Sequence, residues 1–82
     1  MKNIREQFPL LKNDPSLVYL DSAATTLKPS SVVKSISNYY ENYSANIHRS
    51  VYRIADKATD QYEKARAKIA KFINAPTDKS II

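Results

Sequence analysis

Two short segments of the chain carry the residue types that could do chemistry. In the first, Asp21–Thr26, small side chains and hydroxyls would let the backbone come close to a ligand and hold an anion. In the second, Asn46–Arg49, a histidine (His48) that can exchange protons near neutral pH stands beside an arginine (Arg49) that can donate two parallel hydrogen bonds to an anion. Each segment also has a structural interpretation, as a loop of small residues and as a surface or helix-end histidine. Local composition alone favours the structural interpretation for both.

The composition excludes several kinds of site. The 82 residues include no cysteine, so a disulfide, a thiolate metal site and a nucleophilic thiol are all impossible. They include no glycine, so the chain has no glycine-rich phosphate loop. His48 is the only histidine, and one histidine among scattered serines indicates neither a Ser-His-Asp triad nor a histidine-rich metal site. The composition therefore excludes these kinds of site and predicts no metal ligand in this chain.

The charge balance bears on possible partners. A net charge of +5, from 13 basic and 8 acidic residues, would suit an acidic partner or nucleic acid. However, the basic residues between positions 57 and 71 alternate with acidic ones, which is typical of a solvated helix face with pairs such as Asp60 and Lys64. No apolar run approaches the roughly 18 residues that span a bilayer, and residues 1–11 are too polar for a secretory signal. We expect a cytoplasmic chain that binds neither nucleic acid nor a membrane.

Turn residues and apolar runs predict the elements that position the first segment. Residues 3–8 suit a short helical turn that Pro9 closes, and residues 13–16 form a turn cluster. Leu17–Leu20 is a compact run of strand formers. Ser80–Ile82 suits the opening of a second strand, which would have little to pair with and so suggests an incomplete domain.

Two longer helices with apolar stripes are predicted around the second segment. The first begins after Pro29, where Ser30 or Ser31 could cap it, and the second ends at Asn74 and Pro76. The first stripe is rich in tyrosine and so suits a neighbour that offers hydrogen-bond partners, whereas the second is small at its start and bulky at its end, which would anchor that helix to a core. The stripes comprise Val32, Val33, Ile36, Tyr39, Tyr40 and Tyr43, and then Ala55, Ala58, Tyr62, Ala65, Ile69 and Phe72.

Four segments, taken together, resemble a known family. Tyr19–Pro29 closely resembles the opening of the group II cysteine desulfurases and selenocysteine lyases, which are class V aminotransferases with the type I fold of enzymes dependent on pyridoxal 5'-phosphate (PLP). Ala45–Arg49, Ala58–Arg66 and Phe72–Ala75 resemble the next three motifs, in the same order and spacing. The resemblance implies an α/β fold of which residues 1–82 are an incomplete N-terminal segment, with most of the large cofactor-binding domain absent. This segment would be mostly helical, with a short N-terminal helix, a short strand, two longer helices and the start of a strand.

The resemblance also implies roles for individual residues. In the family, the backbone of the small-residue segment helps to hold the substrate carboxylate, a role that would fall on Ala23 and Ala24. The family's His-Arg pair lies near the active-site entrance and the dimer contact, so His48 and Arg49 would also bind substrate. Many members have glycine where this chain has Ser50, which would change the geometry of that turn. The family's Schiff-base lysine and persulfide-forming cysteine belong to later segments, and the nine lysines present do not match its lysine motif. The resemblance thus also implies no catalytic and no cofactor-binding residue in this chain.

For the intact protein, the resemblance implies conversion of L-cysteine to L-alanine. The sulfur would be retained as an enzyme persulfide and passed to an acceptor protein for iron–sulfur cluster assembly. Such a protein would be a cytoplasmic homodimer with PLP as cofactor, and the 82-residue chain alone would be inactive. Three alternatives stay open: a selenocysteine lyase or another class V enzyme, a stand-alone basic helical module that binds RNA or an acidic protein, and a truncated relative that regulates a full-length subunit.

Overall fold

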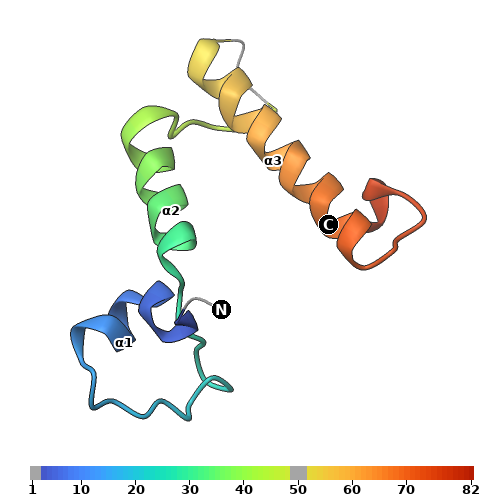
Figure 1. The fold of residues 1–82 in the computed structure, drawn as a ribbon. Helices are drawn as coiled ribbons and strands as arrows, with labels where there is room; N and C mark the ends of the chain where they lie inside the picture. Colours follow the sequence, from blue (N-terminus) through green and yellow to red (C-terminus); the bar gives the residue numbers. More distant parts are fainter. Residues whose placement is uncertain (1–2, 49–51) are drawn as a thin grey trace. The chain divides into compact units, whose positions relative to one another are not determined.

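The computed structural model describes residues 3–48 and 52–82, and helices dominate both ranges (Figure 1). The chain divides into two compact units, Met1–Asn38 and Tyr39–Ile82. Each candidate segment lies within one unit, since Asp21–Thr26 belongs to the first and His48 to the second. None of the helices in the described residues is both long enough and apolar enough to cross a membrane.

The first unit opens with two short helices in place of the single predicted turn. A 3-10 helix, η1 (Ile4–Gln7), is capped by Asn3, whose side-chain oxygen accepts a hydrogen bond from the backbone N–H of Arg5 at 3.1 Å. An α-helix, α1 (Pro9–Asn13), follows, with Pro9 at its first position. The predicted helical turn is present and closes before Pro9, since Phe8 is extended, but Pro9 also begins a helix that was not predicted. Proline needs no N–H at the first helical position and has its φ preset for the helix, so it starts α1.

The side chain of Arg5, a residue of η1, forms hydrogen bonds with the segment that follows α1. Its Nη2 atom donates to the carbonyl oxygens of Asp14 at 3.4 Å, Pro15 at 3.1 Å and Leu17 at 2.6 Å. The predicted turn is present, since the Leu17 N–H donates to the Asp14 carbonyl at 3.1 Å. One guanidinium thus pairs with the Pro15 and Leu17 carbonyls and adds a second donor to the Asp14 carbonyl.

The two predicted strands are not formed in the residues that the structure describes. Leu17–Leu20 is not paired with a neighbouring strand, and its side chains alternate between half-buried and exposed. At the other end, a 3-10 helix, η2 (Asp78–Ser80), includes the first residue of the expected strand opening, and Ile81 and Ile82 after it form no strand. A strand is defined by ladder hydrogen bonds to a partner, and the described residues supply no such partner. Residues 17–20 therefore show the alternating side-chain burial of a strand but form no strand.

The first long helix, α2 (Ser30–Asn42), begins directly after Pro29 as predicted. The hydroxyl of Ser30 donates to the Gln7 carbonyl at 3.1 Å and so ties the start of α2 to the end of η1. The expected apolar stripe is present but largely uncovered, with Val32, Val33, Ile36 and Tyr40 between 40% and 70% exposed.

The second unit is built on α3 (Arg53–Phe72), the predicted last helix. The small start of its stripe is covered, since Ala55 and Ala58 are buried, whereas Ala65 further along is exposed. Ala70 is the other buried hydrophobic residue among those described. The bulky end of the helix is not covered: Phe72 is 90% exposed and Ile73 is 58% exposed. The expectation that this end anchors the helix to a core is not met within the chain, because no described segment packs over it.

Asn74 ends α3 in the predicted place. Its φ of 57° lies in the left-handed region. The N–H of Asn74 donates to the Lys71 carbonyl at 3.2 Å, and the N–H of Ala75 donates to the Ala70 carbonyl at 2.8 Å. This pair of bonds is the Schellman motif, which satisfies the last helical carbonyls.

Candidate functional site

The small-residue segment Asp21–Thr26 forms a braced turn in the first unit. The Asp21 carbonyl accepts hydrogen bonds from the N–H groups of Ala24 at 3.0 Å and Thr25 at 3.2 Å. The Tyr19 hydroxyl bridges the same turn, because it lies within hydrogen-bond distance of the carbonyls of Asp21 (3.3 Å) and Thr25. Lys28 adds a third brace through its Nζ, which donates to the Thr25 hydroxyl at 2.9 Å.

This bracing distinguishes the two alanines predicted to bind substrate. The Ala24 N–H is already engaged by the Asp21 carbonyl, whereas the Ala23 N–H has no acceptor among the described residues. Both side chains are exposed methyl groups that leave the backbone open to solvent. A carboxylate could therefore accept a hydrogen bond from Ala23 without breaking the turn.

His48 occupies the connection between α2 and α3, as predicted, and has an unusual backbone conformation. Its φ of 64° places a residue with a Cβ atom in the left-handed region, which is sparsely populated outside glycine but in which histidine is enriched. Its backbone N–H donates to the Thr59 hydroxyl of α3 at 2.9 Å. Arg49, the other half of the predicted pair, lies outside the described residues.

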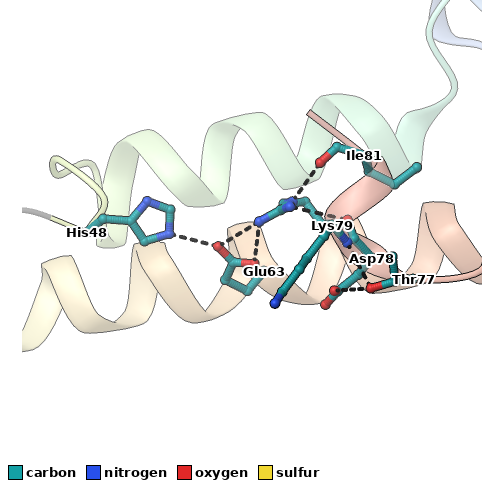
Figure 2. Close-up of polar contacts among 7 residues, drawn as sticks. His48, Glu63, Thr77, Asp78, Lys79 and Ile81 are labelled. Carbon is teal, nitrogen blue, oxygen red and sulfur yellow. Dashed lines mark hydrogen bonds and ion pairs between the residues drawn. The ribbon is translucent and has the colours of Figure 1, made fainter.

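The imidazole of His48 is held by two side chains of α3. Its Nε2 atom lies 2.8 Å from Oε1 of Glu63, and its ring meets the Tyr62 ring edge to face with centroids 5.7 Å apart. The side chains of His48 and Glu63 are 46% and 39% exposed, so the contact lies at the surface and is open to a ligand. Figure 2 shows the two side chains facing each other across this contact.

Arg66 holds the other side of Glu63. Its Nη1 atom donates to Oε2 of Glu63 at 3.0 Å and to Oε1 at 3.3 Å. The same guanidinium donates from Nε to the Ile81 carbonyl at 3.0 Å and from Nη2 to the Asp78 carbonyl at 3.2 Å. The contacts in Figure 2 thus run without a break from His48, through Glu63, to the segment that follows α3. We call His48, Glu63 and Arg66 the His48 triplet.

Sequence reasoning missed Glu63 and Arg66 as members of a site. Both were assigned to a solvated helix face, and for Asp60 and Lys64 on that helix the assignment is confirmed by an exposed ion pair at 2.9 Å. The signal for the site was the i, i+3 spacing of Glu63 and Arg66, which places the two on one side of a helix. That spacing carries no information about which loop the pair faces, so the contact with His48 could not be derived from it.

A cavity of about 470 Å³ adjoins His48 in the second unit. Its wall includes the rings of Tyr39, Tyr43 and Tyr62 and the amides of Asn46 and Gln61. The tyrosine-rich part of the predicted stripe thus combines apolar ring faces with polar tips, as the sequence indicated. Tyr62 belongs both to the wall of this cavity and to the ring contact of His48, so the two features share one residue.

Comparison with known proteins defines the class of protein. The aminotransferase class-V family matches residues 18–82, a range that includes both candidate segments. The chain therefore belongs to the class V aminotransferase family.

Within that family, the chain is similar to cysteine desulfurases, as its motifs predicted. It is 47% identical over 81 residues to cysteine desulfurase SufS of Plasmodium falciparum (isolate 3D7), covering 99% of this chain and 15% of the relative. It is 51% identical over 82 residues to a probable cysteine desulfurase of Vibrio cholerae, covering 96% of this chain and 20% of the relative. The apo structure of a cysteine desulfurase from Thermococcus onnurineus NA1 matches 88% of this chain and 17% of that chain, with a TM-score of 0.76 and 40% identity. The chain thus spans a fifth or less of the length of these proteins.

Proposed function

We propose that this chain is the N-terminal segment of a cysteine desulfurase, which converts L-cysteine to L-alanine and keeps the sulfur as an enzyme persulfide. The observation that carries the proposal is 47% identity across 99% of the chain to a protein named as a cysteine desulfurase. The persulfide sulfur would pass to an acceptor protein for iron–sulfur cluster assembly. The intact protein would be a cytoplasmic homodimer of α/β architecture, and the 82 residues alone would be inactive because they include no cysteine to accept sulfur.

The α/β part of this proposal concerns Leu17–Leu20 and Ser80–Ile82. Leu17–Leu20 keeps the alternation of half-buried and exposed side chains that suits a strand. In the intact protein these segments would gain the ladder partners that the described residues do not provide.

Substrate binding by this segment would use Ala23 and Ala24 in the first unit and His48 and Arg49 in the second. In the first unit, the Ala23 N–H, which has no acceptor among the described residues, is the better donor to the carboxylate of L-cysteine, with the Ala24 N–H serving to hold the turn. In the second unit, His48 supplies a polar side chain at the edge of the tyrosine-lined cavity.

The residues of this chain do not fit the PLP site itself. The chain has no glycine for a phosphate-binding turn, and every lysine that the structure describes is exposed to solvent rather than enclosed where a Schiff base would be protected. PLP would therefore be held by other parts of the intact protein, where it would supply the electron sink for the reaction.

A chimera tests the proposed function. The matched N-terminal segment of the Vibrio cholerae relative is replaced by this chain, the protein is supplied with PLP, and alanine and persulfide are measured after addition of L-cysteine. Because the match is 82 residues long, nearly the entire chain can be exchanged as one block. The relative without any N-terminal segment is the control for activity that does not depend on this region.

We expect the chimera to produce alanine and the truncated control to produce none. A folded chimera that binds PLP but forms no alanine would contradict the proposal. Comparison of L-selenocysteine with L-cysteine as substrate distinguishes a selenocysteine lyase. A chain that inhibits the intact relative when added in trans, and fails in the chimera, would favour the regulatory alternative.

A further inference from the structure

We propose that Glu63 is the positioning residue of His48, and that Arg66 holds Glu63 in place for this task. The inference rests on the proposed function for the part that His48 plays in substrate binding. Beyond that function, Glu63 and Arg66 gain a positioning role, although the sequence placed both on a solvated face of α3.

The connection at His48 is fixed at three points that act on different atoms. The backbone N–H is held by the Thr59 hydroxyl at 2.9 Å, Nε2 by the Glu63 carboxylate at 2.8 Å, and the ring by its contact with the Tyr62 ring. The first contact fixes the backbone in its left-handed conformation, and the last limits the ring to one side of α3. Only the contact with Glu63 selects which ring nitrogen faces the helix.

The partner of Nε2 determines what the rest of the ring can do. An ionised carboxylate only accepts hydrogen bonds, so the proton of the neutral imidazole is assigned to Nε2. Nδ1 then carries the free lone pair, and Figure 2 shows this nitrogen pointing away from Glu63. Nδ1 has no hydrogen-bond partner in the described part of the chain, so it is the ring nitrogen available to a ligand.

Arg66 restricts Glu63 from the opposite side. A carboxylate that contacted only His48 could rotate away, but here both oxygens are engaged by the Arg66 guanidinium. Arg66 is in turn held by the carbonyls of Asp78 and Ile81, so it cannot follow a rotating carboxylate without breaking those bonds. The orientation of His48 is therefore linked to the segment that follows α3.

The neighbouring ion pair on α3 shows the difference between such a network and an ordinary surface contact. Asp60 and Lys64 are 56% and 62% exposed and meet through one contact at 2.9 Å. Exposed pairs of this kind contribute little to stability. The Arg66 side chain is only 25% exposed and donates to one side chain and two carbonyls, which indicates a positioning role rather than solubility.

Nuclear magnetic resonance of the full 82-residue chain tests the proposal, because His48 is the only histidine and its ring signals are therefore unambiguous. The readout is the nuclear Overhauser contact between the rings of His48 and Tyr62. Glu63→Ala removes the partner of Nε2, and Glu63→Gln keeps the shape of the side chain but removes its charge. Asp60→Ala, which removes a carboxylate of the same helix that does not touch His48, is the matched control.

We expect the ring contact to be present in the wild type and in Asp60→Ala, lost in Glu63→Ala and weakened in Glu63→Gln, with the amide shifts of α3 retained. Arg66→Lys should also weaken it, because a lysine cannot engage both carboxylate oxygens and the two carbonyls together. A ring contact that survives in Glu63→Ala would overturn the proposal, and so would its absence from the wild type. If Glu63→Ala unfolds α3, the isosteric Glu63→Gln variant decides.

The chimera separates this proposal from the proposed function. His48→Ala in the chimera should raise KM for L-cysteine more than it lowers kcat. An inactive chimera would contradict the proposed function, and an unchanged KM in His48→Ala would contradict the role of His48 in substrate binding. In either case, the ring contact measured in the 82-residue chain still shows whether Glu63 positions the histidine.

Discussion

The end of α3 offers a sharp test of how local sequence sets this structure. Asn74 has a φ of 57°, a conformation that costs a residue with a Cβ atom about 1–2 kcal/mol and costs glycine nothing. Asparagine loses less than other residues because its short polar side chain can bond locally. We therefore expect Asn74→Gly to stabilise the last turn and Asn74→Ala to destabilise it, with a difference of about 1 kcal/mol between the two variants.

Amide hydrogen exchange measures this difference directly. The N–H of Ala75 donates to the Ala70 carbonyl at 2.8 Å and is released when the Schellman motif opens. A difference of about 1 kcal/mol corresponds to about fivefold in the opening equilibrium, so Ala75 should exchange about five times faster in Asn74→Ala than in Asn74→Gly. Ala67→Gly is the control. Here glycine enters the exposed interior of α3, where it should destabilise the helix by about 0.5–1 kcal/mol.

The reasoning is refuted if Ala75 exchanges at the same rate in the alanine and glycine variants. Slower amide exchange of α3 in Ala67→Gly would also refute it, because glycine is expected to stabilise the chain at position 74 and to destabilise it at position 67.

Three further predictions concern the stability of the chain. Thermal unfolding of the isolated 82 residues, followed by far-ultraviolet circular dichroism, should be broad, because the described residues bury only three alanine side chains, and a sharp two-state transition would contradict this. Arg5→Met should speed exchange of the Leu17 N–H by releasing the turn that the guanidinium holds, whereas Lys12→Met removes the same charge and should leave that rate unchanged. Tyr19→Phe should increase the backbone mobility of residues 21–25, seen as reduced heteronuclear Overhauser values, because the hydroxyl that bridges the turn is lost; unchanged values would mean that the turn holds without it.

Elements set by local sequence could be predicted, and elements that need a distant partner could not. Pro29 and Asn74 bound α2 and α3 as expected, because proline and a left-handed residue act on the backbone next to them. The strands at Leu17–Leu20 and Ser80–Ile82 were predicted from residue type, yet strand formation depends on a partner that no local pattern supplies.

The candidate site follows the same division. His48 was singled out because its type and its neighbour Arg49 suggest chemistry, and the structure places it on the connection where it was expected. Its partner Glu63 lies 15 positions away on α3, and the contact depends on how the chain returns past the helix. Sequence reasoning could single out His48 by its type, but only the fold shows that Glu63 contacts it.

The distribution of apolar surface connects these observations to function. The described residues bury three small side chains and leave Phe72 and Leu20 about 90% exposed, although large apolar residues ordinarily drive a fold by being covered. Helices α2 and α3 nevertheless form, because their ends and periodicity are encoded locally. The same exposed faces and the unpaired run at Leu17–Leu20 are what a segment needs if the remainder of a larger class V enzyme is to pack against it. The turn at Ala23 and the His48 triplet are, by contrast, already held by hydrogen bonds within the described residues. If the proposed function holds, such a segment would bring a turn and a histidine contact that are already formed to a protein whose core is completed by other parts.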